Sequence, residues 1–221
     1  SHTVDNAVQS VMFPVMSQSQ NDKTVINNIL LKTISTGSLL IMPIMLGLAA
    51  ISEPLVTVLL TDKWLPCVVY MQLVCVANAS ISLTSSNLVV IKSLGRGDVY
   101  MKLELIRRII MFFILFVSVF FFNSILAIAI GYVISLWLDY FIIVIPVKRL
   151  IGLGIKEQVS VIYKIVIAAI AMFIIVLMIG SLDLPPLLLL CIQIPAGVLV
   201  YLLACHVLRI ECFYNLLKKI K

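Results

Sequence analysis

The sequence predicts an all-α fold, a polytopic transmembrane helix bundle, and three observations lead to this fold class. Hydrophobic residues make up 62% of the chain and charged residues only 12%. The mean hydropathy of +1.19 is also far above that of soluble globular proteins, which carry roughly 25% charged residues. A membrane-spanning helix needs about 20 apolar residues. Long stretches without a charged residue run over 33–52, 64–91, 109–138, 165–182 and 184–208.

We expect about seven membrane helices in a single transmembrane domain, residues 1–221. The apolar tract after Arg108 is too long for one span, and the Asn123-Ser124 pair is the turn signal inside it, so the tract divides into two helices. Polar stretches such as "SQSQNDK", "TDKW" and "SLDLPP" separate other spans. The expected spans are 1–19, 30–60, 66–92, 101–122, 124–147, 157–181 and 186–208.

Lysine and arginine are distributed unequally between alternate loops. If the spans alternate in direction, fifteen of the sixteen basic residues fall on one side of the membrane and only Lys63 falls on the other. The positive-inside rule places the basic side in the cytoplasm. The chain is therefore expected to enter its first span from outside and to end with a cytoplasmic C-terminus.

The most highly charged segment is "IKSLGRGDVYMKLELIRRII". Gly95 and Gly97 permit a tight turn, Asp98 suits the N-cap of the next helix, and Glu104 is at helical spacing from Arg107 and Arg108. The basic residues of this loop either orient the protein and contact lipid headgroups or bind a substrate pyrophosphate directly. These candidates are Lys92, Arg96, Lys102, Arg107 and Arg108.

Asp139 lies within the apolar stretch "SLWLDYFIIVIP". A carboxylate at the centre of a membrane helix costs roughly 2.5 to 3.5 kcal/mol on insertion scales, so its side chain should face the bundle, a partner or water. Asp139 is a candidate for a substrate or ion cavity, and the alternative is a structural hydrogen bond to a neighbouring helix.

Other uncharged and charged polar residues are candidates for the same cavity. Asn78, Ser82 and Ser85 share one helix face with Asn87 near its end, which either packs against other helices or lines a cavity. Asp5 and Gln9 share a face of the first helix at i, i+4, where a loop or interface position is equally compatible with the sequence. Glu53, before Pro54, is expected at the membrane interface.

Several function classes find no support in the sequence. The five cysteines show no metal-ligand spacing, so we expect no metal and no cofactor. His2 and His206 lie at opposite ends of the chain with no nucleophile or carboxylate constellation around either, so we expect no enzyme activity. The net charge of +6 is dispersed among apolar spans, which argues against nucleic-acid binding.

Three strings in order along residues 8–108 resemble the C-terminal half of bacterial polysaccharide-repeat-unit flippases. They are "SVMFPVMSQSQND", "MPIMLGLAAISEPLVTVLLTDKWLPCVVYMQLVC" and "NLVVIKSLGRGDVYMKLELIRR". These flippases belong to the multidrug/oligosaccharidyl-lipid/polysaccharide exporter superfamily. Beyond residue 108 only hydropathy and helix count are similar to the family.

The resemblance implies a carrier of about twelve to fourteen helices whose two lobes rock about a central cavity. The chain would supply one lobe plus two C-terminal helices, and its opening at Ser1, which reads as mid-protein, leads us to expect a fragment without the N-terminal lobe. The implied substrate is an undecaprenyl-pyrophosphate-linked oligosaccharide, moved across the bacterial cytoplasmic (inner) membrane for O-antigen, capsule or exopolysaccharide synthesis. The expected partners are this lipid-linked substrate, membrane lipids, the missing lobe and, as a further candidate, glycan polymerase machinery.

Two alternatives remain open. A multidrug or cation antiporter of the same superfamily would share the fold. An integral-membrane polymerase or acyltransferase of glycan assembly would need a catalytic cluster in a sizeable loop, whereas the predicted outer loops are only a few residues long.

Overall fold

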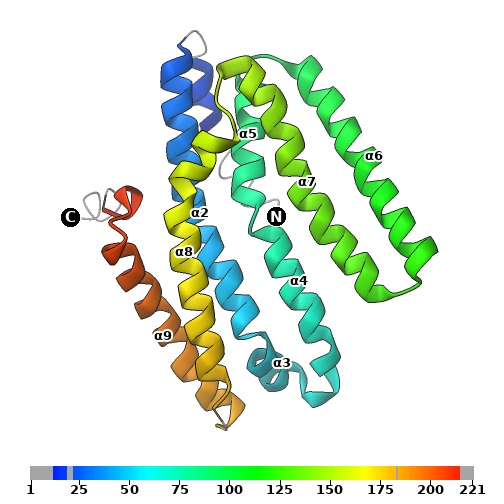
Figure 1. Ribbon diagram of the computed structural model, residues 1–221, viewed down its shortest axis with the longest axis vertical. Helices are drawn as coiled ribbons and strands as arrows, with labels where there is room; N and C mark the ends of the chain where they lie inside the picture. The colour runs from blue at the N-terminus through cyan, green and yellow to red at the C-terminus, as the bar shows by residue number, and fades with distance from the viewer. Residues whose placement is uncertain (1–11, 19–21, 183, 215–221) are drawn as a thin grey trace. The chain divides into compact units, whose positions relative to one another are not determined.

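A computed structural model describes residues 12–18, 22–182 and 184–214, and within these residues all regular structure is helical (Figure 1). The predicted all-α class is confirmed. Residues 12–18 are helical, and the elements that follow are α2 (Lys23–Ala50), α3 (Ser52–Leu60), the 3-10 helix η1 (Asp62–Cys67), α4 (Val68–Asn78), α5 (Ile81–Ser93), α6 (Gly97–Phe122), α7 (Ile125–Ile151), α8 (Ile155–Gly180) and α9 (Pro186–Val207).

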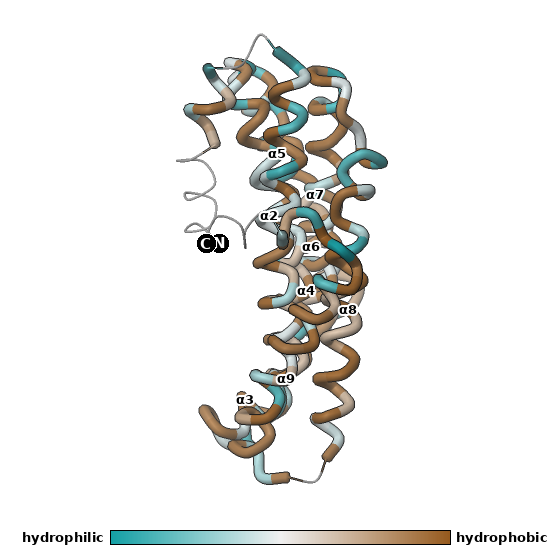
Figure 2. Tube along the Cα trace, turned by 90° about the vertical axis from the view of Figure 1, so that its left-hand side faces the viewer, coloured by the Kyte–Doolittle hydropathy of each residue, from teal (hydrophilic) through white to brown (hydrophobic). Residues whose placement is uncertain are grey.

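Six helical stretches among the described residues are long and apolar enough to cross a membrane. Figure 2 shows hydrophobic residues along most of the length of the helices. Of the expected first span, 1–19, only residues 12–18 are described, so most of it lies outside the described residues. The six stretches are Lys23–Ala50, Asp62–Ser93, Gly97–Phe122, Ile125–Ile151, Ile155–Gly180 and Pro186–Val207.

The segment expected as one span over 30–60 is two helices, because α2 ends at Ala50 and the short α3 begins at Ser52. Pro54 has no amide hydrogen to donate to the carbonyl of Ala50, so the helical hydrogen-bond ladder is interrupted at this point. Proline is tolerated in the first turn of a new helix, where its amide would have no intrahelical partner. The sequence contained this signal in Glu53-Pro54, which we interpreted only as an interfacial position.

The segment expected as one span over 66–92 also divides, into α4 and α5, with a turn at Ala79 and Ser80. Hydroxyl groups of α5 bond back to carbonyls one turn earlier, and the hydroxyl of Thr84 reaches the break itself through a hydrogen bond to the Ser80 carbonyl (3.3 Å). Such back-bonding competes with the backbone ladder and bends helices. The serine-rich composition of this stretch therefore accounts for the break.

The turn between α5 and α6 follows a standard helix C-terminal motif. Gly95 has a φ of +68°, and the amides of Gly95 and Arg96 donate to the carbonyls of Lys92 and Ile91. The prediction of a turn at Gly95 is confirmed. The prediction that Asp98 caps α6 is wrong, because Arg96 occupies the N-cap position and Asp98 lies in the first helical turn.

The chain separates into two compact units. Unit 1 comprises residues 1–38 and 80–162, and unit 2 comprises residues 39–79 and 163–221, so α2 and α8 contribute residues to both. In unit 1, α6 and α7 form an antiparallel hairpin and α5 packs against both. The hairpin turn is at Asn123, whose φ of +46° agrees with the turn predicted there.

Unit 2 has a core built around α3, which packs against η1, α4 and α9. Val56 of α3, Cys75 of α4 and Val176 of α8 are among its buried side chains. Tyr201 of α9 is also buried, and its hydroxyl donates to the carbonyl of Leu39 (2.8 Å). This bond ties α9 to the part of α2 that belongs to unit 2.

Candidate functional site

In unit 1 the buried carboxylate of Asp139 is paired with Arg107. Asp139 lies on the face of α7 that also carries the buried residues Gly131 and Ser135, at intervals of four residues. This face contacts α6, where a side chain at Gly131 would meet the hydroxyl of Ser118. Arg107 of α6 donates from Nη2 to Asp139 Oδ2 at 2.8 Å, and both side chains are only 11–12% exposed. The structure therefore brings together one cavity candidate and one headgroup candidate.

Glu104 extends the ion pair into a cluster of four charged side chains. Glu104 accepts from Arg107 Nη1 (2.9 Å) and, through its other oxygen, from Arg108 Nη2 (3.0 Å), so the predicted pairing at helical spacing is confirmed. Two carboxylates and two guanidinium groups make the cluster electrically neutral. A neutral hydrogen-bonded cluster is the form in which charges can be accommodated between apolar helices. One atom remains without a partner, the buried Nε of Arg107.

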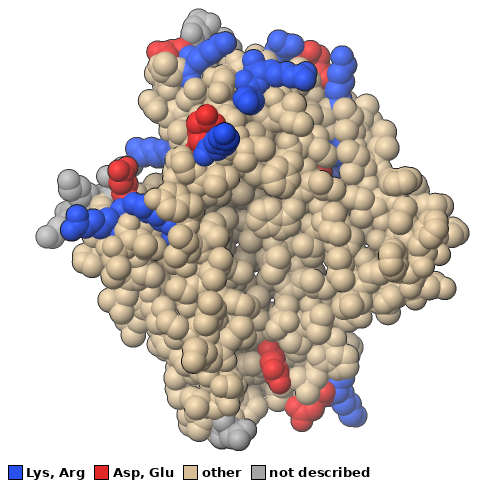
Figure 3. Space-filling model, viewed as in Figure 1, with Lys and Arg blue, Asp and Glu red and all other residues tan. Residues whose placement is uncertain are grey.

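The other basic candidates of the α5–α6 region lie at the surface of unit 1 in different environments. Lys92 places its ammonium group 4.6 Å from the centre of the Tyr100 ring, a cation–π contact. Arg96 pairs with Asp98 at 3.3 Å, and both side chains are at least half exposed. Lys102 is exposed. Figure 3 shows Lys and Arg gathered in groups with acidic residues among them and a broad uncharged surface elsewhere.

These environments separate the basic candidates by what they could bind. Arg107 is held by two carboxylates, so it can reach an external phosphate only if one of these pairs opens. Arg108 is 70% exposed, and together with Arg96 and Lys102 it can meet an anionic headgroup without breaking a buried contact. The geometry therefore favours headgroup or phosphate contact by the exposed residues, whereas Arg107 is engaged in its two ion pairs in this structure.

A second polar centre of unit 1 is a reciprocal pair of amides. Asn87 Nδ2 donates to Gln158 Oε1 (3.0 Å), and Gln158 Nε2 donates to Asn87 Oδ1 (2.9 Å). The hydroxyl of Tyr140 donates to the same Gln158 oxygen at 3.3 Å. Both amide side chains are fully buried. The network joins α5, α7 and the first turn of α8, and each amide nitrogen and oxygen of the pair makes at least one hydrogen bond.

Sequence reasoning selected Asn87 but missed Gln158 and Tyr140. Gln158 lies in "GIKEQVS", which we assigned to the loop and the start of a span, where a polar residue needs no explanation. The structure begins α8 at Ile155, so Gln158 is already in the bundle. The available signal was its spacing: Gln158 shares a helix face with the apolar residues Ile162 and Ile165, which are also buried.

The remaining candidates are not part of these two centres. Asn78, at the end of α4 in unit 2, donates to the Val74 carbonyl (2.7 Å), and Ser85 bonds back within α5. Ser82 is buried against Gly37, and its hydroxyl has no partner. Asp5 and Gln9 lie outside the described residues. No group of three His, Cys, Asp or Glu side chains that could hold a metal ion is found in the described part of the chain.

Comparison with known proteins supports a role in polysaccharide metabolism. Residues 1–69 match the model of a family described as "Polysaccharide biosynthesis protein". No curated protein and no solved structure matches the chain. The matched segment covers α2, α3 and η1 and overlaps the first two of the three strings that carry the flippase resemblance. A role in glycan assembly or transport fits this match.

Proposed function

We propose that the chain forms part of a carrier that moves undecaprenyl-pyrophosphate-linked oligosaccharide repeat units across the bacterial cytoplasmic membrane. The observation that carries this proposal is the coincidence of the polysaccharide-biosynthesis match with six helical stretches, among the described residues, that are long and apolar enough to span a membrane. A bundle of spanning helices joined by short connections suits a transport path through the membrane. We accordingly propose transport by alternating access, with no enzymatic step.

The neutral cluster of unit 1 has the properties that such a carrier would need. Alternating access requires polar groups that can exchange partners as helices move. Arg107 has two carboxylate partners, so displacement of Asp139 would leave Arg107 bound to Glu104 through Nη1 and would free the N–H donor of Nη2. That donor could then meet a phosphate oxygen, which arginine recognises well. We propose this exchange as the role of Asp139 and Arg107.

The test is complementation of a strain that lacks its repeat-unit flippase, using the full-length gene and its Asp139→Asn and Asp62→Asn variants. Asn is close in shape to Asp and cheaper to bury, so Asp139→Asn should insert normally. Surface polysaccharide per inserted protein should fall severalfold in Asp139→Asn and stay at the wild-type level in Asp62→Asn, which changes an exposed carboxylate. Unchanged polysaccharide per protein in Asp139→Asn would remove the proposed role of the cluster. Failure of the wild-type gene itself, with drug or cation efflux instead, would favour the antiporter.

We also propose that the α5–α6 turn is cytoplasmic and the Thr61 turn extracytoplasmic. The charge asymmetry of the loops supports this orientation. Single cysteines at Gly97 and Thr61 in a cysteine-free background report on it, because both positions are exposed and a side chain at Gly97 meets nothing within 4 Å. An impermeant thiol reagent should label the Thr61 position in intact spheroplasts and the Gly97 position only after lysis. The reverse pattern would invert the topology.

A further inference from the structure

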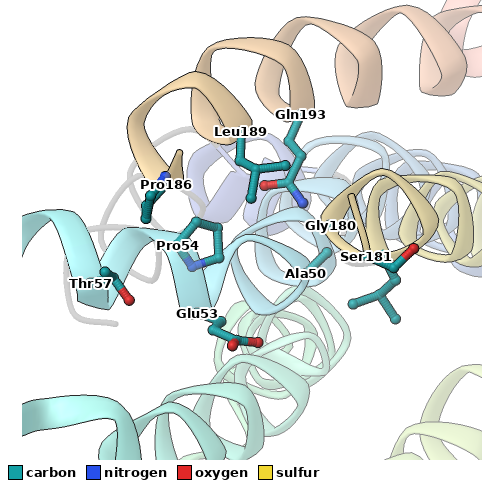
Figure 4. Close-up of a pocket in the computed structure, with 10 residues that line it drawn as sticks. Ala50, Glu53, Pro54, Thr57, Gly180, Ser181, Pro186, Leu189 and Gln193 are labelled. Carbon is teal, nitrogen blue, oxygen red and sulfur yellow. The ribbon is translucent and has the colours of Figure 1, made fainter. Parts of the chain in front are cut away.

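Unit 2 contains a surface pocket of about 330 Å³ at one end of its membrane-spanning helices. As Figure 4 shows, its lining comes from the region around α3, from the end of α8 and from α9. α2 ends at Ala50, α8 ends at Gly180 and α9 begins at Pro186, and all three residues line the pocket. The ends of membrane spans lie in the headgroup region of a bilayer. The volume is at the lower end of the range for small-molecule sites, about 300 to 1,000 Å³.

Two hydrogen-bond acceptors that line this pocket have no donor. Gln193 is 1% exposed; its Nε2 donates to the Val176 carbonyl (3.1 Å), whereas its buried Oε1 has no partner. A buried amide oxygen without a partner is uncommon in proteins and calls for an explanation. The carboxylate of Glu53, which lies in the first turn of α3, is exposed and makes no hydrogen bond or ion pair with any described residue. No Lys or Arg is among the described residues that line the pocket.

The rest of the lining limits the chemistry of a ligand. Pro54, Leu177 and Leu189 give apolar walls, and Thr57 adds a hydroxyl group. A divalent cation takes six or more oxygen ligands and usually several carboxylates, whereas Glu53 is the one carboxylate among the described residues that line this pocket. A primary ammonium group instead brings one positive charge and three donors, which suits a carboxylate, an amide oxygen and a hydroxyl group.

We propose that this pocket binds a primary ammonium group, with Glu53 as the charge partner and Gln193 Oε1 as a second acceptor. Such a group could come from a phosphatidylethanolamine headgroup or from an amino sugar. In either case, the adjoining carbon atoms would lie against Pro54 and Leu189. The proposal concerns binding only and does not depend on which cargo the protein moves.

The test measures binding to the purified full chain in phosphatidylcholine nanodiscs. The melting temperature is followed while phosphatidylethanolamine is added to the nanodiscs or while glucosamine is added to the buffer, with glucose as the control lacking an amine. Phosphatidylcholine has no N–H donor, so it provides the matched lipid background. We expect stabilisation by one of the two amines, and the amine that acts identifies the source.

Three variants establish whether the stabilisation comes from this pocket. Glu53→Gln should weaken the apparent affinity for the amine roughly tenfold or more, since the amide that replaces the carboxylate carries no charge to pair with the ammonium group. Gln193→Met keeps the side-chain volume and removes Oε1, and should weaken binding by a smaller factor. Asp62→Asn changes an exposed carboxylate of η1 outside the pocket and should bind as wild type does.

Some outcomes would overturn the proposal. These are the absence of stabilisation by either amine, equal weakening in Asp62→Asn, or stabilisation by Mg²⁺ that depends on Glu53. Transport activity enters none of these readouts, so failure of this proposal and failure of the carrier proposal are distinguishable.

Discussion

Two buried glutamines, one in each compact unit, are bonded in different ways. Gln158 in unit 1 exchanges hydrogen bonds with another side chain, Asn87, and accepts a third from Tyr140. Gln193 in unit 2 makes one bond, to a backbone carbonyl, and keeps its oxygen unpartnered beside a pocket. A closed side-chain network stabilises the helices that it joins, and every member depends on the others. An amide held by one bond to the backbone can serve a ligand with its other atom.

The carboxylates of the two units also differ in whether they have a partner. In unit 1, the buried carboxylate of Asp139 is paired with Arg107, whereas in unit 2 the exposed carboxylate of Glu53 has no partner among the described residues. If this contrast is correct, a substitution that removes one partner of a buried pair in unit 1 should lower stability and should show strong coupling between the partners. Substitutions at the unit 2 pocket should change stability little and ligand response more.

The largest effect is expected for Arg107→Leu, which leaves Asp139 as a buried carboxylate without its cation. Breaking a buried pair by removing one partner costs about 3–5 kcal/mol, whereas replacing both partners by apolar residues is often neutral. The double variant Arg107→Leu/Asp139→Leu should therefore regain most of the lost stability. The free energy of unfolding, measured by SDS titration of protein in mixed micelles, gives the coupling. Additive losses in the double variant would contradict a mutually dependent pair.

A matched pair of substitutions tests the two glutamines directly. Gln158→Met removes three hydrogen bonds and leaves the Asn87 oxygen and the Tyr140 hydroxyl without partners, which should lower the free energy of unfolding by about 2–3 kcal/mol. Gln193→Met removes one bond and also removes the unpartnered oxygen, so the change should stay within about 1 kcal/mol. Equal losses in the same unfolding assay would mean that the two amides are not used differently.

The sequence predicted the fold class because apolar length and turn residues are local signals. Asn123 is a turn and Glu104 pairs with Arg107 and Arg108, as local spacing indicated. The partners of buried polar groups could not be predicted in this way. Asp139 and Arg107 lie 32 residues apart in the sequence, and Asn87 and Gln158 lie 71 residues apart. Their pairing depends on how different helices pack together, and patterns of neighbouring residues do not show this.

The pocket of unit 2 was missed for a similar reason. Glu53 was interpreted as interfacial from its neighbour Pro54, and Gln193 was not distinguished within an apolar span. Only the packing of α9 on α8 and α3 brings these two residues to the lining of one pocket. Neither residue carries a spacing motif, so no pattern along the chain indicates that they share a site.

The effect on stability of adding a methyl group at a helix glycine should also differ between the units. A side chain at Gly131 in unit 1 would place its Cβ 2.5 Å from Ser118 Oγ and 3.3 Å from Ile114, so Gly131→Ala should destabilise by about 1–2 kcal/mol. At Gly47 in unit 2, the nearest atom is the flexible end of Met172 at 3.6 Å. Gly47→Ala should be neutral or slightly stabilising, because alanine favours helix more than glycine does.

Ser118→Ala is the control for the proposed clash at Gly131. It removes the oxygen closest to the introduced methyl group, so Gly131→Ala/Ser118→Ala should recover part of the loss in the same SDS titration. If stability is not recovered, the loss in Gly131→Ala comes from the contact with Ile114 or from the backbone of α7. A Gly47→Ala loss as large as that of Gly131→Ala would remove the packing contrast between the units.

The smallest effect is expected at Asp22, where the partners are exposed to solvent rather than buried. Asp22 Oδ1 accepts from the amides of Thr24 (2.9 Å) and Val25 (3.3 Å) and from the Thr24 hydroxyl, so it caps the N-terminus of α2. The hydroxyl of Thr24 is the main cause that lowers the pKa of Asp22 below its ordinary value of 3.8, and the two amides add to it. A carboxyl whose pKa is lower in the folded state stabilises that state above its unfolded pKa, and this contribution disappears as the pH falls through the folded value.

Hydrogen exchange at the first turn of α2 measures this contribution. Protection of the Thr24 and Val25 amides, corrected for the intrinsic pH dependence of exchange, should be constant above about pH 4.5 and should decrease as Asp22 is protonated below its ordinary pKa of 3.8. Asp22→Ala should lower protection at all pH values and abolish the pH dependence, while Asp22→Ser should retain part of the protection without a titration. The loss should stay within the first turn, because capping acts on amides that lack intrahelical partners. A change that extends to α5 or α7 would show that this exposed cap is coupled to the buried polar network of unit 1.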